Sequence, residues 1–327
     1  DADNLFLQKT DELFQCGYFC AVFINPCIFH TGLFVLKPSK KVFADMVRSL
    51  ENKLENLDGA DQGFIGSYFP NLLDSPMFHP HNRTKKLEGE YRLPLGYQMD
   101  ATYYYLRLRW NVPCGPNSVI TFPGALWLKP WYWWSWPVLP LGIQWHEQRR
   151  QTLGYGGELP VAVILSVVYV AIIALARLLP SVSKLWNRRT EKNPSFLQTS
   201  VKIIAVCSFL TAYVLPFFAV PCTIHPLLGW ALYFLGAFAA CAVVVSLFGL
   251  PVVPVLTLWV GILGSLFVMA YPWYPHGVMR ALSIFGYAVI CSPFVWSSMV
   301  KVAKSLQVPE RDAFFPKSGE SSPPKLY

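Results

Sequence analysis

The first residues of the chain have the types and the spacing that cation chemistry needs. The sequence opens DADNLFLQKTDELF, which places Asp1 and Asp3 one residue apart. Carboxylates are preferred ligands of hard divalent cations, so such a pair could hold a metal and leave its other positions to water and phosphate oxygens. A solvated turn explains the same two aspartates equally well. Metal binding is therefore one of two interpretations of this motif.

A second polar group lies in the stretch DGADQGFIGSYF. Asp58, Asp61 and Gln62 occur within five residues there, and Gly59 follows Asp58 directly. Glycine permits close approach of the backbone to a ligand. These side chains are candidates for contacts with a polar substrate.

The elements that must position these residues have mixed periodicity. YFCAVF and GLFVL are typical of short buried strands, and the stretch KPSKKVFADMVRSLENKLENL repeats its apolar residues at helical spacing. The repeat consists of Val42, Met46, Leu50 and Leu54. Because strand, turn and helix alternate, we expect an α/β domain over residues 1–150.

The second half of the chain has the composition of a membrane protein. The 327 residues are 54% hydrophobic with a mean hydropathy of +0.36, and no acid lies between Glu191 and Glu310. About 20 apolar residues suffice for a helix to cross the hydrocarbon core. Five candidate stretches follow, at about 159–179, 201–221, 227–248, 252–271 and 281–300. We expect an all-α membrane region over 151–300 and a basic tail over 301–327.

Basic residues set the expected orientation and argue against nucleic acid as a partner. The net charge is +8, but the basic residues gather beside apolar runs, as in PSVSKLWNRRTEKNPS, instead of forming a stripe interleaved with stacking aromatic rings. This is the positive-inside pattern of membrane proteins. The link and the tail should therefore be cytosolic, and residues before Leu159 lumenal. The sequon at Asn82 agrees, because N-glycosylation occurs on that side.

Three further patterns each leave an alternative open. A transporter could use five spans, but carriers usually keep an ionisable group near the midplane and these stretches have none, so we favour an anchor. The tryptophan-rich WLKPWYWWSWPVLPLGIQW is typical of an aromatic belt at headgroup depth, and it could also shape a cleft for a lipid-linked acceptor. Cys16, Cys20, Cys27 and His30 fit no zinc spacing, which favours a lumenal disulfide or buried thiols.

Taken together, the ordered motifs resemble a known family. DADNLFLQKTDELF, FHTGLFVLKPS, DGADQGFIGSYF, LPLGYQMD and VITFPGALWLKPW occur in the order and rough spacing of the glycogenin-like glycosyltransferases of family 8. The version with C-terminal spans looks like the plant glycogenin-like starch initiation proteins, grouped with glucuronosyltransferases. The resemblance covers about residues 1–150 and implies the C-terminal part of a GT-A-like nucleotide-sugar transferase domain. In that family several strands precede the DxD pair, so we expect a fragment of a longer protein, inactive by itself.

The resemblance also implies a role for each matching residue. Asp1 and Asp3 would bind Mn²⁺ at the diphosphate of a UDP-sugar, and Gly124 and Lys129 would contact the same diphosphate. The donor sugar would lie against His30, Thr31, Asp58 and Gly59, with Asp61 and Gln62 as the catalytic residues near its anomeric carbon.

Two positions depart from the family pattern. Thr121 stands where the family has a histidine that ligates the metal, and His30 with Thr31 replaces the usual Asn-Ser. His30 would either alter the choice of sugar or be a satisfied core histidine. His146 is interpreted as an interfacial residue, not a displaced ligand.

The leading hypothesis is a Golgi, multi-pass hexosyl- or glucuronosyltransferase with a lumenal catalytic domain and a cytosolic tail. It would move a sugar from a UDP-sugar to a glycan or lipid-linked acceptor, with Mn²⁺ and with retention. The departure at Thr121 motivates the alternative of a catalytically inactive membrane scaffold with a transferase fold.

Overall fold

The computed structural model describes residues 2–25, 28–56, 58–80, 86–108, 118–178 and 194–305. Several predictions lie outside these residues: the metal ligand Asp1, the sequon at Asn82, Cys27, most of the basic link and the tail. The chain divides into two compact units. The first comprises Asp1–Glu158, Pro221–Trp230 and Ser265–Tyr287, and the second Leu159–Val220, Ala231–Gly264 and Ala288–Tyr327.

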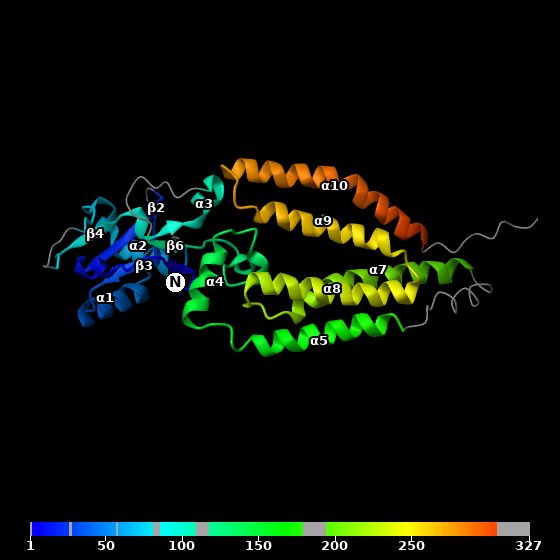
Figure 1. Ribbon diagram of the computed structural model, residues 1–327. Helices are drawn as coiled ribbons and strands as arrows, with labels where there is room; N and C mark the ends of the chain where they lie inside the picture. Colours follow the sequence, from blue (N-terminus) through cyan, green and yellow to red (C-terminus); the bar gives the residue numbers. More distant parts are fainter. Residues whose placement is uncertain are drawn as a thin grey trace, which may run out of the picture. The chain divides into compact units, whose positions relative to one another are not determined.

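The first unit contains the predicted α/β arrangement, with two three-stranded sheets among the described residues (Figure 1). One sheet has the order β1-β6-β5 and the other β3-β2-β4. The strands are β1 (Asn4–Phe6), β2 (Phe19–Asn25), β3 (Ile28–Leu36), β4 (Glu90–Leu93), β5 (Met99–Asp100) and β6 (Val119–Thr121). The helices are α1 (Lys40–Glu51), α2 (Asp61–Tyr68), α3 (Ala101–Arg107) and α4 (Gly142–Thr152). Short 3₁₀ turns are η1 (Asp11–Gln15), η2 (Pro70–Asp74), η3 (Leu95–Tyr97), η4 (Leu126–Leu128) and η5 (Trp133–Ser135).

The central strand β2 explains why YFCAVF is apolar throughout. It pairs antiparallel with β3 and parallel with β4, and the side chains from Phe19 to Val22 are buried on both faces. A strand buried on both faces has a continuous hydrophobic run in place of an alternating one. Cys16 and Cys20 form a disulfide beside this strand, which confirms the disulfide interpretation.

Helix α1 is shorter than the predicted repeat. The Ser39 side chain accepts a hydrogen bond from the Val42 N–H at 3.3 Å and so caps the helix N-terminus. The helix ends at Glu51, and Leu54 lies beyond it. The predicted helix is therefore present without its last turn.

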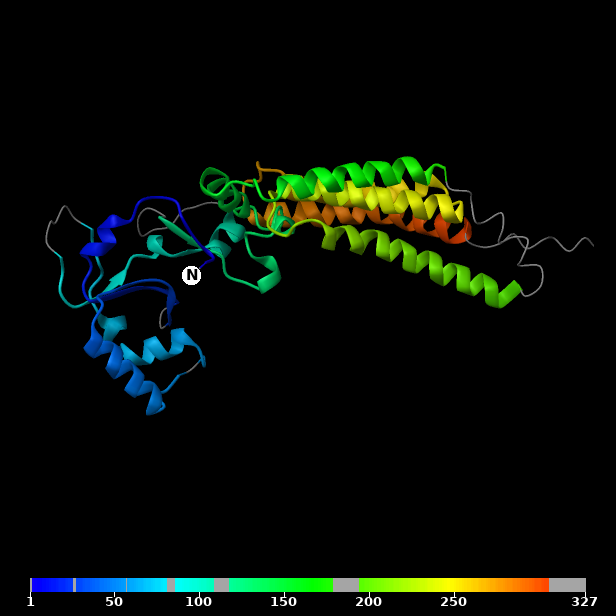
Figure 2. The same ribbon diagram turned by 90° about the horizontal axis from the view of Figure 1, so that it is seen from below.

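The second unit consists of long apolar helices, which run roughly along one direction in Figures 1 and 2. By length and composition, four helices of the described chain could cross a membrane: α5, α8, α9 and α10. In α7 the apolar stretch Ile203–Ala219 is shorter, and it corresponds to the second predicted span. The bounds are α5 (Leu159–Ala176), α7 (Pro194–Ala219), α8 (Pro226–Phe248), α9 (Val252–Ala270) and α10 (Gly277–Ser305).

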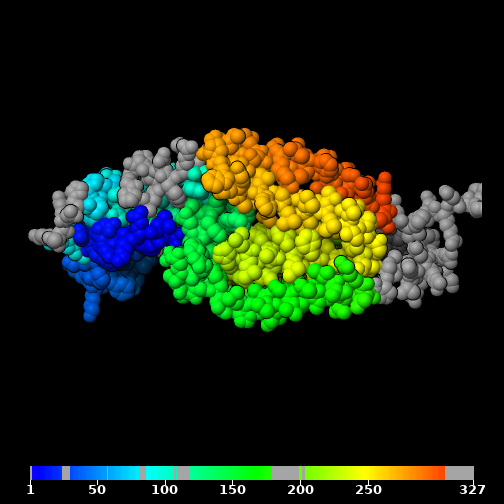
Figure 3. All heavy atoms as spheres, in the orientation of Figure 1, coloured from blue at the N-terminus to red at the C-terminus, as the bar shows by residue number. Residues whose placement is uncertain are grey.

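Trp259 of α9 lies at the centre of the packing in the second unit. Its side chain is 1% exposed and stacks on Tyr213 of α7 with ring centroids 4.6 Å apart. Ala237 and Cys241 of α8 belong to the same cluster. Small residues let membrane helices approach closely, so they leave room for this indole. In the space-filling view, side chains of α8 (yellow) pack continuously with those of α5 (Figure 3).

Hydrogen bonds hold the later segments of the first unit to its tryptophan-rich stretch. Trp230 Nε1 donates to the carbonyl of Trp136 at 2.6 Å, and an Arg280 guanidinium nitrogen donates to that of Pro137 at 2.5 Å. These contacts join the beginnings of α8 and α10 to the chain before α5. The segments that follow α7 and α9 therefore belong with the α/β part.

The tryptophan-rich stretch contains both buried and exposed side chains, and its interpretation as a belt stays a prediction. Trp133 is fully buried, and its ring meets that of Trp230 edge to face at 5.0 Å. Trp127, in contrast, is 69% exposed. A Cβ on Gly229 would lie 2.5 Å from Trp133 Cγ. Trp133 is thus a core residue whose space depends on a glycine of α8.

We expect Gly229→Ala to destabilise the protein, because the added methyl group has no room beside Trp133. Overpacking of this kind costs about 1–3 kcal/mol. Gly286→Ala in α10 is the matched control, because a Cβ there meets nothing within 4 Å. Thermal unfolding of the purified protein in detergent, followed by tryptophan fluorescence, should show a lower Tm for the first variant only. Equal Tm values would contradict this packing.

His146 of α4 is a buried histidine and not the interfacial residue that we predicted. Its side chain is fully buried, and Nδ1 lies 2.6 Å from the Tyr155 hydroxyl. Burial, then the charges of His225 and Arg149, lower the pKa of His146 to about 3, while the Pro130 carbonyl acts weakly in the opposite direction. The Arg149 guanidinium also binds Glu158 and the carbonyl of Thr223. His146 is therefore neutral in the folded protein.

The buried His146 should make stability fall in mild acid. The unfolded chain takes up a proton at His146 below about pH 6.5, whereas the folded chain does not until about pH 3. The free energy of unfolding is therefore highest above pH 6.5 and decreases as the pH falls toward 3. Protonation of His146 alone changes the free energy of unfolding by up to about 1.4 kcal/mol per pH unit. His146→Gln should flatten the Tm profile between pH 6.5 and 4.5, whereas the exposed control His276→Gln should not. An unchanged profile in His146→Gln would contradict the assignment.

Candidate functional site

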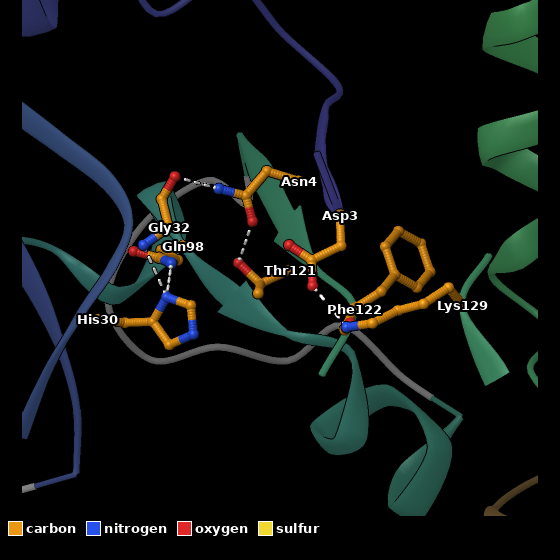
Figure 4. Close-up of polar contacts among 8 residues, drawn as sticks. All are labelled: Asp3, Asn4, His30, Gly32, Gln98, Thr121, Phe122 and Lys129. Carbon is orange, nitrogen blue, oxygen red and sulfur yellow. Dashed lines mark hydrogen bonds and ion pairs between the residues drawn. The ribbon is translucent and has the colours of Figure 1, made fainter. Parts of the chain in front are cut away.

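Two predicted site residues, distant in the sequence, form a partly buried ion pair. Lys129 Nζ donates to Asp3 Oδ2 at 2.7 Å and to the carbonyl of Phe122 at 3.0 Å (Figure 4). The side chains of Lys129 and Asp3 are 12% and 17% exposed. Asp3 directly precedes β1, and Lys129 follows η4. The fold thus brings the predicted metal ligand to the predicted diphosphate residue.

The other carboxylate oxygen of Asp3 meets the first requirement of a cation site. Asp3 Oδ1 is buried and has no hydrogen-bond partner within the described residues. A buried carboxylate oxygen without a partner is a suitable ligand for a hard cation. The described residues contain no group of three His, Cys, Asp or Glu side chains for a metal, and Asp1 lies outside them. A cation ligated by Asp3 therefore stays a prediction.

Thr121 has a structural role that explains its departure from the family pattern. It is 1% exposed, and its Oγ1 donates to Asn4 Oδ1 at 2.8 Å, across the antiparallel pair in which Asn4 faces Thr121. Asn4 Nδ2 in turn donates to the carbonyl of Gly32 at 2.6 Å. The threonine hydroxyl orients the Asn4 amide, so it does not substitute for a metal-binding imidazole.

His30 and Thr31 lie in β3, next to the hydrogen bond between Asn4 and Gly32. His30 Nδ1 accepts from the Gly32 N–H at 2.9 Å and lies 2.5 Å from Gln98 Nε2 (Figure 4). Burial lowers the pKa of His30, against the opposing charges of Asp3, Asp100 and Asp61. Thr31 is 8% exposed. The contacts with Gly32 and Gln98 therefore determine the position of the histidine ring.

The DGADQ segment forms the turn that begins α2. Asp58 Oδ1 accepts from the N–H groups of Ala60 and Gly63, each at 2.9 Å. Gly59 has φ +69°, a left-handed conformation that favours glycine. Asp61 and Gln62 are the first residues of α2, and Asp61 is the one whose charge acts on His30. Asp58 thus shapes the turn from which Asp61 begins α2.

Gly124 lies in the loop between β6 and η4, on the way to Lys129. Its φ is +113°, and a Cβ there would meet nothing within 4 Å. The backbone conformation and not crowding therefore requires glycine at this position. The loop returns the chain so that Lys129 reaches Asp3.

Sequence reasoning missed two residues of this cluster, Asn4 and Gln98. Asn4 is the residue after Asp3, and Gln98 is fully buried between the apolar Tyr97 and Met99. A lone polar residue inside an apolar run was the available signal, since a buried amide must find hydrogen-bond partners. The partners themselves come from distant strands and could not be read from the sequence.

Comparisons with known proteins agree with the motifs. Residues 157–314 match the family model described as the PGSIP7 C-terminal domain. The chain is 61% identical over 325 residues to "Putative glucuronosyltransferase PGSIP7" of Arabidopsis thaliana, which covers 98% of this chain and 66% of that protein. It is 34% identical over 167 residues to "Inositol phosphorylceramide glucuronosyltransferase 1" of the same plant, or 48% of this chain and 30% of that protein. Glycogenin-1 of Caenorhabditis elegans is 31% identical over 135 residues, covering 40% and 28%.

The α/β fold and these similarities indicate the glycosyltransferase class of protein, with apolar helices in the same chain. The chain belongs to the glycogenin-like glycosyltransferases, in the plant subgroup related to glucuronosyltransferases and carrying a C-terminal helical region. It spans 66% of the length of the PGSIP7 relative. No solved structure matches it.

We expect Thr121→Val to loosen the strand pair β1–β6. The substitution keeps the shape but leaves Asn4 Oδ1 without its donor, a loss of about 1–3 kcal/mol for a buried acceptor. The control Thr152→Val removes an exposed hydroxyl that bonds only within α4. Only the first variant should lower the Tm. Identical melting of the two variants would show that the Thr121–Asn4 contact contributes nothing.

Proposed function

We propose that the whole protein transfers a hexuronic acid or a hexose from a UDP-sugar to a glycan or lipid-linked acceptor. The observation that carries this proposal is the pairing of Asp3 with Lys129 in a chain similar to proteins named glucuronosyltransferases. The predicted metal ligand and the predicted diphosphate residue are then in direct contact.

Each residue of the cluster has a task in this reaction. Asp3, with Asp1, would hold Mn²⁺, which acts as a Lewis acid toward the departing UDP. Lys129 exchanges its contact with Asp3 for the diphosphate, as a point charge on a flexible stem. Asp61 and Gln62 lie at the start of α2, where they would bind the donor sugar near the reacting carbon. Retention of configuration belongs to the proposal because the family resemblance implies it.

The membrane helices and the disulfide support the proposed location. Disulfides persist in oxidising compartments, so Cys16–Cys20 favours a lumenal site for the α/β part. The proposed compartment is the Golgi, with the tail in the cytosol. One relative is named for a lipid substrate, inositol phosphorylceramide, which favours a lipid-linked acceptor with its sugar-accepting group at the bilayer surface.

A second candidate function follows from Thr121. Its hydroxyl is committed to Asn4, so the family's third metal ligand is not replaced at that position. A protein that binds nucleotide weakly and transfers nothing would be an inactive membrane scaffold with a transferase fold. Such a protein would show UDP binding without transfer across a broad screen of donors and acceptors.

The proposal predicts loss of activity in Asp3→Ala. In membranes that carry the full-length protein with Mn²⁺, UDP release from the preferred donor should fall on the order of 100-fold, because the diphosphate loses its cation. Asp1→Ala should have the same effect. The exposed Asp74→Ala is the control and should retain wild-type turnover. Undiminished turnover in both Asp1→Ala and Asp3→Ala would exclude the proposed mechanism.

A further inference from the structure

Two groups approach the same nitrogen of the His30 ring. The Gly32 N–H is 2.9 Å from Nδ1, and Gln98 Nε2 is 2.5 Å from it (Figure 4). A backbone N–H can only donate, so Nδ1 must be an unprotonated acceptor. A neutral imidazole then carries its proton on Nε2. The backbone of Gly32 thus determines the tautomer of His30.

The orientation of the Gln98 amide follows from the same contact. An amide oxygen and nitrogen have nearly the same shape, but only the NH₂ group can face an acceptor nitrogen. Gln98 is fully buried, and its Oε1 has no partner in the described part of the chain. A buried amide oxygen without a partner is unfavourable and calls for an explanation. The contact of Gln98 Nε2 with His30 explains why the amide keeps this orientation.

Gly32 leaves the space in which both donors reach the ring. A Cβ at this position would lie 2.3 Å from Gln98 Nε2 and 2.7 Å from His30 Nδ1. Either contact is far inside van der Waals distance. Gly32 also accepts from Asn4 Nδ2 at 2.6 Å, which fixes its peptide relative to the residue after Asp3. The position of the His30 imidazole is therefore linked through Gly32 and Asn4 to the predicted metal ligand Asp3.

We propose that Gln98 and Gly32 are positioning residues that hold His30 as its Nε2–H tautomer, so that the ring presents an uncharged N–H donor to an oxygen of the donor sugar. This inference rests on the proposed function, which places His30 at the sugar. The His30 side chain is half-buried, and the charges of Asp3 and Asp61 both act on it. The ring is joined through Gly32 to Asn4, the residue that follows Asp3.

The inference predicts different effects on the affinity for a UDP-sugar and on the affinity for UDP. Full-length protein in detergent with Mn²⁺ is titrated with UDP-glucuronic acid, UDP-glucose and UDP. In Gln98→Met, the Kd of the preferred UDP-sugar should rise about 3- to 10-fold while that of UDP changes less than about twofold, because one hydrogen bond to the sugar is weakened. Gly32→Ala should act in the same direction. Gln144→Met, an exposed glutamine on α4, is the control and should bind both as wild type does.

A second measurement reads the tautomer without activity or substrate. Selective ¹⁵N-histidine labelling gives distinct nitrogen shifts for protonated and unprotonated ring positions, and His30→Asn assigns the signals of His30. We expect an unprotonated Nδ1 and a protonated Nε2 in the wild type, and a loss of this single pattern in Gln98→Met.

Three results would overturn the inference. They are a protonated Nδ1 on His30, an unchanged sugar affinity in Gln98→Met, and an equal loss of UDP and UDP-sugar affinity in that variant. Failure of the proposed function looks different, because wild-type protein would then bind neither nucleotide sugar while the nitrogen shifts still report the tautomer. The two hypotheses can thus fail separately.

Discussion

The side-chain amide of Asn4 is the contact on which the arrangement of the site depends. Its oxygen accepts from Thr121 in β6, and its nitrogen donates to the carbonyl of Gly32 in β3. The two partners belong to different sheets, which share no strand. A part-buried amide whose oxygen and nitrogen both have partners is held in one orientation. It therefore fixes the edge of one sheet relative to the other, and Asp3 is the residue immediately before it.

A second amide repeats this bridge a short distance away. Gln98 directly precedes β5 of the first sheet and reaches His30 of the second. Because two separate amides join the same two sheets, they restrict both the rotation of one sheet against the other and the distance between the sheets. His30 is thus held within β3, and Asp3 directly precedes β1. Such positioning reduces the reorganisation that a reaction would otherwise require.

The sequence predicted the elements of this structure better than the contacts between them. YFCAVF, GLFVL and the repeat from Val42 to Leu50 indicated strand, strand and helix because each has the apolar spacing of its element. The long apolar helices were equally clear, because a stretch of about 20 apolar residues is typical of a helix that crosses a membrane. Neither pattern contains information on which polar groups meet across two sheets. Asn4, Gln98 and the role of Thr121 thus emerged only from the fold.

The tryptophan-rich stretch shows a different limit. Tryptophan favours membrane interfaces because its ring is apolar and its N–H is polar, and those properties also suit a buried position. Trp127 is exposed while Trp133 is enclosed beside Gly229, although both occur in one continuous motif. The glycine that makes the space is almost 100 residues away in the chain.

The charges of the site explain why a cation is needed for the proposed chemistry. Asp3, Asp61 and Asp100 all act on His30, and Lys129 is the cation bound to Asp3. A neutral His30 adds no positive charge, so an anionic diphosphate would meet more negative than positive groups. Lys129 alone cannot compensate both Asp3 and the diphosphate, because one ammonium group satisfies only one of them closely at a time. A divalent cation on Asp3 would release Lys129 for the nucleotide, which makes metal binding and nucleotide binding cooperative.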